Sequence, residues 1–258
     1  MVVQAGEGVL TRLPTPAGRL LVATAAPPER DAVARAFGAP DTPEETALPG
    51  AVLLRTPGAD VLAAGVGPAA AASATSAALT AARLAGNPYD LVVSAGIGGG
   101  FAERAPVGAV VVADRIVAAD LGAETPDGFV PVTELGFGTD VHTPPAALVE
   151  AAREAGLVPG AVLTVSTVTG SAARAAELLT RHPSAVAEAM EGFGVAEAAT
   201  AHGVPVLEIR AISNAIGPRD RDAWRIPAAL TALTSAFVRL APAEAGSPFA
   251  LARARLVP

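Results

Sequence analysis

The run VLAAGVGPAAAASATSAALTAA, residues 61–82, carries no charged residue and is long enough to suggest a membrane span. It consists mostly of alanine, glycine, serine and threonine, however, and Pro68 interrupts it. Proline is favoured in the first turn of a helix, where its missing N–H costs no hydrogen bond. We therefore interpret the run as a strand, a turn and a helix over 68–85, the repeating unit of an α/β fold.

The same alternation extends along the chain in both directions. Several apolar runs are continuous rather than alternating, which is typical of strands covered on both faces. The predicted strands are 19–25, 51–56, 61–67, 91–96, 109–120, 161–168 and 204–213. The predicted helices are 29–37, 68–85, 144–155, 172–181, 184–202 and 221–240. This order implies an α/β layer fold with a mostly parallel sheet, and the charged strand 109–120 with the glycine-rich stretch to residue 140 suggests an antiparallel excursion.

Composition limits the domain count and the class of partner. No linker divides the 258 residues, so we expect one domain over 19–240, between a flexible N-terminal tail, 1–18, and a C-terminal tail, 241–258. The N-terminus does not resemble a secretory signal, and a cytoplasmic protein with no membrane partner is expected. A net charge of −7 and 3% aromatic residues indicate no nucleic-acid partner.

Two kinds of chemistry are not expected. The chain has no cysteine, which excludes disulfides and thiolate catalysis. Its three histidines, His142, His182 and His202, lack the paired spacing of metal ligands, so we predict no metal and no cofactor.

A carboxylate at Glu191 stands in the nearly apolar stretch VAEAMEGFGVAEAA, residues 186–199. On a helix over 184–202 it points along a stripe of small and apolar side chains, whereas Glu188 and Glu197 lie at other angles and are expected to reach solvent. The stripe consists of Gly194, Val195, Ala198 and His202. A buried carboxylate is costly unless something donates hydrogen bonds to it. Its partner could be an arginine in the core, the start of a helix, or a ligand such as a vicinal diol.

Polar or glycine-rich junctions follow four of the predicted strands, and ligands in open α/β sheets bind beyond the carboxyl ends of strands. Glu29 opens a helix after the first strand, where it could complement the helix dipole or, at a cleft, deprotonate a water. The stretch LVVSAGIGGGF, 91–101, would let a ligand approach the backbone closely. It is not a clean dinucleotide-binding fingerprint, and its glycines could equally be structural.

The other two junctions carry hydroxyl and amide groups. In TVSTVTGS, 164–171, Thr167 and Thr169 offer hydroxyls and Gly170 could admit a flat ring, whereas Ser171 is better explained as a helix N-cap. Asn214 directly follows the last apolar strand and could be a turn residue or a hydrogen-bonding group aimed into the cleft.

Four motifs, in this order and spacing, resemble those of the purine nucleoside phosphorylase and nucleosidase superfamily. They are GVGPAAAA (65–72), SAGIGG (94–99), MEG (190–192) and RAISN (210–214). The combination of MEG with a later R-x-[IL]-S-[DN] is specific, and the resemblance extends over about residues 19–240. It implies a three-layer αβα sandwich with a mixed, mostly parallel central sheet.

Within that superfamily the chain is most similar to the futalosine hydrolase family, through TAAPPERDAV (24–33), SAGIGGGF (94–101) and ISNAIGPRDRDAW (212–224). The resemblance implies an N-ribosidic hydrolase that cleaves futalosine to hypoxanthine and dehypoxanthine futalosine in menaquinone biosynthesis. The alternatives are a phosphate-dependent purine nucleoside phosphorylase, an adenine-type nucleosidase acting on methylthioadenosine or aminofutalosine, and a non-catalytic nucleotide-binding module.

Roles for single residues follow from the resemblance by position. Glu191 would accept hydrogen bonds from the 2′- and 3′-hydroxyls of a ribose, and Met190 would pack against the sugar. Glu29 would activate the attacking water, and Asn214 would polarise the departing base. The base and sugar would be lined by Ile97, Gly98 and Gly99, and we place Thr169 and Gly170 beside them.

Asn214 also bears on the choice of base, because adenine-cleaving relatives carry an aspartate there. An amide can donate towards N7 and O6 of hypoxanthine, whereas a carboxylate would repel O6. The sequence therefore predicts a 6-oxopurine. Water is favoured over phosphate as the nucleophile because Glu29 would repel phosphate and the strand before the glycine-rich loop brings no arginine; Arg30 and Arg210 keep phosphate open as an alternative.

Trp224 falls where relatives place an aromatic side chain near the 5′-substituent of the nucleoside. The 5′-substituent of futalosine ends in a benzoate, and Arg219 or Arg221, with Arg225 nearby, could bind that carboxylate. A solvated charged turn explains these arginines equally well. Because relatives complete this pocket with a neighbouring subunit, the resemblance implies a homo-oligomer, to which the segment 139–145 could contribute.

Overall fold

The computed structural model describes residues 18–39 and 44–240. The tails expected at 1–18 and 241–258 lie, apart from Gly18, outside the described residues. The strands are β1 Leu20–Thr24, β2 Glu44–Leu48, β3 Ala51–Arg55, β4 Asp60–Ala63, β5 Leu91–Gly100, β6 Val110–Ala118, β7 Gly122–Thr125, β8 Gly128–Pro131, β9 Val141–His142, β10 Val158–Thr164, β11 Ala185–Ala189 and β12 Val206–Ala215. The helices are α1 Pro27–Ala36, α2 Pro68–Leu84, α3 Ala146–Glu154, α4 Ala172–Arg181, α5 Gly192–Ala201 and α6 Ile226–Leu240.

The uncharged run 61–82 forms the strand, turn and helix that its composition predicts. β4 ends at Ala63, Gly65 and Gly67 adopt φ angles of +91° and +89°, and α2 begins at Pro68. Positive φ values are open to glycine because it has no Cβ, so this turn depends on both glycines. Within the described ranges, none of the helices has the length and apolar character that a bilayer crossing needs.

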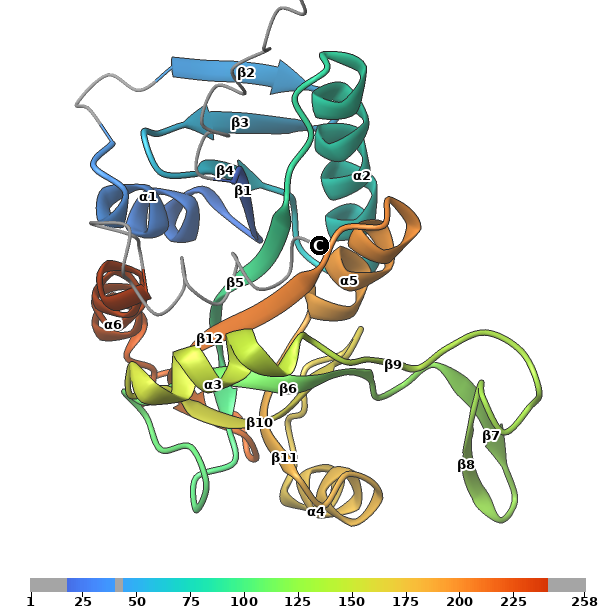
Figure 1. Ribbon diagram of the computed structural model, residues 1–258. Helices are drawn as coiled ribbons and strands as arrows, with labels where there is room; N and C mark the ends of the chain where they lie inside the picture. The colour runs from blue at the N-terminus through green and yellow to red at the C-terminus, as the bar shows by residue number, and fades with distance from the viewer. Residues whose placement is uncertain (1–17, 40–43, 241–258) are drawn as a thin grey trace, which may run out of the picture.

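A ten-stranded mixed sheet forms the centre of the described chain (Figure 1). Its order is β11-β10-β6-β12-β5-β1-β4-β3-β2, with β9 paired to β6. The consecutive strands β4, β1, β5 and β12 are parallel, whereas β6 runs antiparallel to β12 and β7 pairs with β8 in a separate antiparallel ribbon. The antiparallel excursion predicted for 109–140 is therefore confirmed. Because β11 also pairs with β5, half of the sheet closes into a ring.

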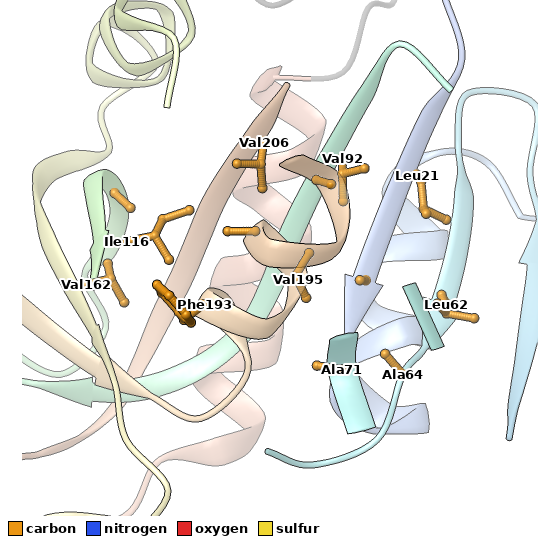
Figure 2. Packing of buried hydrophobic residues seen from close by; sticks show 14 of the residues in the cluster. Leu21, Leu62, Ala64, Ala71, Val92, Ile116, Val162, Phe193, Val195 and Val206 are labelled. Atoms are coloured by element: carbon orange, nitrogen blue, oxygen red, sulfur yellow. The ribbon is translucent and has the colours of Figure 1, made fainter. Parts of the chain in front are cut away.

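Helices cover both faces of this sheet, as the predicted layers require. Buried side chains of α1, α3 and α6 form one core with the sheet, and those of α2 and α5 form the other (Figure 1). In the second core, Phe193 and Val195 of α5 lie over sheet residues that include Val92, Ile116 and Val162 (Figure 2). Packing on both faces fixes the strand ends relative to one another.

The helix predicted over 184–202 is wrong in its first half. Ala185–Ala189 form β11, and α5 begins only at Gly192. Alanine, glutamate and methionine favour a helix locally, but the chain pairs here with β10 and β5, and such tertiary pairing overrides propensity. Glu191 is consequently the N-cap residue of α5 and lies on no helical stripe, and Glu188 is buried rather than exposed to solvent.

Four short strands, β2, β7, β8 and β9, have no counterpart among the predicted elements. Their side chains are exposed or half-buried, so they leave no continuous apolar run in the sequence. The other predicted strands and helices are present with shifted ends, and α4 spans the predicted residues 172–181.

Helices α2 and α5 pack with their backbones in contact at Gly194. A Cβ at this position would overlap the carbonyl oxygen of Pro68, a backbone atom that cannot rotate aside. We expect Gly194→Ala to lower the free energy of unfolding by roughly 1–3 kcal/mol, the usual cost of overpacking. Urea unfolding followed by circular dichroism measures this change. Ala201→Ser adds one atom to an exposed position of the same helix and should change stability by less than about 0.5 kcal/mol; equal effects of the two substitutions would contradict the close packing.

Candidate active site

One hollow beyond the carboxyl ends of β1, β5 and β12 collects side chains from all four predicted junctions. The predicted site residues that line it are Glu29, Ile97, Gly98, Gly99, Thr169, Met190, Glu191, Asn214 and Trp224. A second hollow adjoins it at Thr169, Asn214 and Trp224 and is lined also by Gly170 and Arg219. Arg221 lines neither hollow, so the structure unites most but not all of the predicted set.

Glu29 is held in a fixed position at the junction of β1 and α1. Its Oε2 accepts hydrogen bonds from the N–H groups of Ala25 and Ala26, both 3.0 Å long, and its Oε1 accepts one of 2.8 Å from the N–H of Ile97. The hydrogen bonds from Ala25 and Ala26 stabilise the start of α1, which begins at Pro27, so Glu29 has the role at a helix start that its sequence position suggested. Burial raises the pKa of the Glu29 carboxyl, against the lowering effects of Arg210 and the Ile97 N–H. A carboxyl of raised pKa that faces a hollow is suited to accept a proton.

Glu191 has both of the protein environments that the sequence suggested for it, the start of a helix and a buried arginine. It stands at the start of α5, and its carboxylate accepts hydrogen bonds from Arg210 Nη1 and the N–H of Gly67, both 3.2 Å long. Each carboxylate oxygen thus accepts one bond, whereas a carboxylate offers about four acceptor positions. The remaining capacity faces the hollow beside Met190 and is sufficient for a diol.

Arg210 joins the acidic residues behind the hollow. Its side chain is 1% exposed, and besides Glu191 it donates from Nε to Glu208 Oε1 at 2.9 Å and from Nη2 to Ser94 Oγ at 3.0 Å. Burial raises the pKa of Glu208, against the lowering effect of Arg210, and Glu208 Oε2 has no hydrogen-bond partner among the described residues. Arg210 therefore holds the carboxylate of Glu191 in position. The motif RAISN by itself did not predict this role for its arginine.

Asn214 is oriented by the residue before it. Ser213 Oγ donates to Asn214 Oδ1 at 2.8 Å, and Asn214 Nδ2 donates to the carbonyl of Ala215 at 3.1 Å. The amide oxygen is thus committed to Ser213, while the Nδ2 group keeps one further N–H. Asn214 can therefore present a donor to the hollow, as the prediction for a 6-oxopurine requires.

The glycines of β5 make room chiefly for the protein's own atoms. A Cβ at Gly96 would lie 2.5 Å from Glu29 Oε1 and 2.8 Å from Arg210 Nη1. A Cβ at Gly99 would lie 2.8 Å from Ile216 and 3.4 Å from Asn214 Nδ2. A structural role for the glycine-rich stretch is thus confirmed at Gly96, where the lack of a Cβ lets the side chains of Glu29 and Arg210 approach β5.

Thr169 and Ser171 have different tasks in the loop after β10. Ser171 is the N-cap of α4 and accepts a hydrogen bond from the N–H of Arg174 at 3.2 Å, as predicted. Thr169 is buried and donates twice to Glu188, from its N–H at 2.8 Å and from Oγ1 at 2.5 Å. Glu188 lines the hollow too, although helical spacing assigns it to solvent. Its position toward the hollow could have been predicted only by assigning residues 185–189 to a strand, in which successive side chains point to opposite faces.

The charged turn after Asn214 surrounds Trp224. The guanidinium carbons of Arg219 and Arg221 lie 5.8 Å and 6.0 Å from the centre of the indole ring. Arg30, the other arginine considered for phosphate, is paired with Asp31 and Glu45 at the surface of α1. Neither Arg30 nor the enclosed Arg210 is free to bind an anion in the hollow.

Residues 139–145 are not among the described residues that line either hollow. His142 Nε2 is 2.8 Å from Glu197 Oε1, and its ring packs on Phe193 with 5.1 Å between the ring centres. Among the described residues, no group of three or more histidine or acidic side chains is arranged to hold a metal ion.

Comparisons with known proteins show the family to which the chain belongs. A family model described as "Phosphorylase superfamily" matches residues 21–241, so the chain belongs to that superfamily. The futalosine hydrolase of Streptomyces coelicolor is 72% identical over 225 residues, which cover 86% of this chain and 95% of that protein. The futalosine hydrolase of Acidothermus cellulolyticus is 48% identical over 85% of this chain and 89% of its own length. Within the superfamily, the chain belongs to the futalosine hydrolases.

Solved structures show the same fold. A 5′-methylthioadenosine/S-adenosylhomocysteine nucleosidase from Colwellia psychrerythraea, in complex with adenine, aligns with a TM-score of 0.71 at 22% identity, covering 87% of this chain and 96% of its own. The futalosine hydrolase of Helicobacter pylori aligns with a TM-score of 0.70 at 20% identity, covering 85% and 95%. The α/β fold inferred from the sequence motifs is confirmed.

Proposed function

We propose that this protein hydrolyses the N-ribosidic bond of futalosine and releases hypoxanthine and dehypoxanthine futalosine. The observation that carries the proposal is the meeting of Glu29, Glu191 and Asn214 in one hollow, in a chain that is 72% identical to a futalosine hydrolase. Glu29 lies in α1 directly after β1, Glu191 lies between β11 and α5, and Asn214 lies near the end of β12. Because these elements are far apart in sequence, only the folded chain unites the three residues.

The sugar half of the reaction rests on Glu191 and Glu29. Glu191 binds the ribose hydroxyls with its two free acceptor positions, and Met190 packs on the ring. We place C1′ of the ribose between these two carboxylates of the hollow, where their negative charge favours the oxocarbenium-like transition state of glycoside cleavage. Glu29 takes the proton from a water that attacks C1′, and burial raises the pKa of its carboxyl, which makes the ionised group a stronger base.

The base half rests on Asn214. Its free N–H donates to the N7 and O6 edge of hypoxanthine and stabilises the electrons that the base carries away. Ser213 fixes the amide in that orientation by donating to its oxygen. An aspartate held in the same way would present an acceptor to O6, which is why the asparagine supports a 6-oxopurine.

Water is the proposed nucleophile because no arginine, lysine or histidine is among the described residues that line the first hollow. Arg210 is engaged by Glu191, Glu208 and Ser94, and Glu29 would repel an anion next to the sugar. These contacts argue against the phosphorylase alternative. The adenine-type nucleosidase is opposed by Asn214, and a non-catalytic module would have no use for a buried proton acceptor.

The family resemblance suggests further features of the proposed complex with futalosine. We place the 5′-substituent towards Trp224 and the second hollow, with Arg219 better situated than Arg221 to meet a carboxylate. We also propose that residues 19–240 form one domain and that the enzyme works in the cytoplasm, in menaquinone biosynthesis, as a homo-oligomer whose subunits share the pocket.

Release of free base separates the alternatives. We expect rapid release of hypoxanthine from futalosine at the same rate with and without phosphate, and far slower release from aminofutalosine, inosine and methylthioadenosine. Chromatography of the products measures each rate. A requirement for phosphate would identify a phosphorylase, a preference for aminofutalosine would identify an adenine-type enzyme, and binding without release would identify a non-catalytic module.

A further inference from the structure

Glu188 is a buried acidic residue that the proposed chemistry does not use. It is 4% exposed, lies on β11 and lines the same hollow as Asn214. No salt bridge to Glu188 occurs within the described ranges; its two protein bonds both come from Thr169. A carboxylate in such a place is costly without enough donors, so its presence calls for a further partner.

Strand register places Glu188 directly across from Asn214. Gly99 of β5 is the register partner of Glu188 on one side and of Asn214 on the other. The register of β12 shifts between Ile212 and Asn214, so the contacts show the shared face. A Cβ at Gly99 would lie 3.4 Å from Asn214 Nδ2, and Glu188 and Asn214 line the same hollow beside Gly99. Two strand spacings separate their backbones by roughly 10 Å, which leaves space for one flat heterocycle between the side chains.

The carboxylate keeps unused acceptor positions on the side of the hollow. Thr169 occupies one position on Oε1 and one on Oε2, and a carboxylate has about four. Burial raises the pKa of Glu188, whereas the two Thr169 donors and the more distant Arg174 lower it. These donors favour the ionised form, which accepts hydrogen bonds and donates none.

We propose that Glu188 is a specificity-determining residue that accepts a hydrogen bond from N1–H of a 6-oxopurine base, on the opposite side of O6 from Asn214. The inference rests on the proposed function and names the group that reads the base. In a 6-oxopurine, O6 stands between N7 and N1–H, so a donor from Asn214 and an acceptor from Glu188 complement adjoining parts of one edge. In adenine, N1 carries a lone pair, which an ionised Glu188 would repel.

The test compares futalosine with aminofutalosine, which carries adenine, for the wild type and Glu188→Gln. A glutamine amide can donate to N1 of adenine, and it loses the charge that attracts N1–H. We expect the ratio of kcat/KM values, futalosine over aminofutalosine, to fall by roughly tenfold to a hundredfold in Glu188→Gln, the range found when a buried hydrogen-bonding group loses its match.

A matched variant separates base reading from support of the loop. Thr169→Val removes the hydroxyl that donates to Glu188 and leaves the carboxylate in place. The backbone N–H of residue 169 still donates to Glu188 Oε1 and supports the ionised form, so kcat/KM should fall for both substrates alike and the ratio should stay within about threefold of the wild type. A Glu188→Gln variant that lowers both activities alike, with an unchanged ratio, would overturn the proposal.

A measurement on the unaltered protein guards against misfolding of the variant. Product inhibition by 1-methylhypoxanthine, which lacks N1–H, should be at least about tenfold weaker than inhibition by hypoxanthine. Equal inhibition would overturn the role of Glu188. Failure of the wild type to release hypoxanthine from futalosine would refute the proposed function itself, whereas normal release with unchanged base selectivity in Glu188→Gln would refute only this inference.

Discussion

Glu29→Gln is expected to lower kcat/KM for futalosine by about 10²–10⁴-fold, the usual contribution of a general base. Glutamine keeps the shape of the side chain and an oxygen that can accept from the backbone N–H groups of Ala25 or Ile97, but it cannot take a proton from water. The measurement is the initial rate of hypoxanthine release at several substrate concentrations. Thermal unfolding of the same preparation shows whether the variant is folded.

The pH profile provides an independent reading of the same residue. Burial raises the pKa of Glu29, and only its ionised form can act as a base. The activity of the wild type should therefore fall as pH decreases through a midpoint above the value of about 4.3 that is usual for a glutamate. Glu45→Gln, at an exposed residue of β2 near α1, is the control and should keep the wild-type rate and profile. Wild-type activity in Glu29→Gln would show that another group activates water.

Arg210→Met is expected to lower the free energy of unfolding by about 3–5 kcal/mol, because it leaves buried carboxylates without their cation. Glu191 and Glu208 both lose a charged donor, and both are at least nine-tenths enclosed. Urea unfolding monitored by circular dichroism measures the loss. This loss of unfolding free energy should be far larger than the loss caused by removing an exposed arginine, because water cannot solvate the buried carboxylates that remain.

Arg153→Met is the matched control for the arginine substitution. Arg153 forms its ion pair with Glu150 at the surface of α3, where both side chains are more than half exposed. Its loss should cause no measurable change, because exposed ion pairs contribute little. A second variant, Arg210→Met with Glu208→Leu, removes one of the orphaned carboxylates and should recover part of the stability. Equal stability of Arg210→Met and the wild type would show that the buried network does not depend on its cation.

Much of the fold follows from local sequence. Continuous apolar runs mark β1, β3, β5, β6, β10 and β12, and proline or serine marks the starts of α2 and α4. These signals are local because burial on both faces and capping act on neighbouring residues. The same logic places Glu29 in the first turn of the helix after a strand and Asn214 at the end of a strand, where they occur.

Local signals fail where a non-local partner decides the conformation. Residues 185–189 have the composition of a helix and form a strand because β10 and β5 lie on either side. This difference alone changes Glu188 from a solvent-exposed residue into a wall of the hollow. A preference of a few tenths of a kcal/mol per residue for a helix is too small to compete with two strand partners.

By itself, the sequence determined the layer architecture, the family and the three polar groups that carry the proposed chemistry, because motifs at strand ends combine residue type with position. Only the tertiary structure decided what surrounds those groups. It buries Arg210 between Glu191 and Glu208, uses Gly96 to admit Glu29, and sets Glu188 across β5 from Asn214. These relations depend on register between strands far apart in sequence, and register is a property of the closed sheet rather than of any one segment.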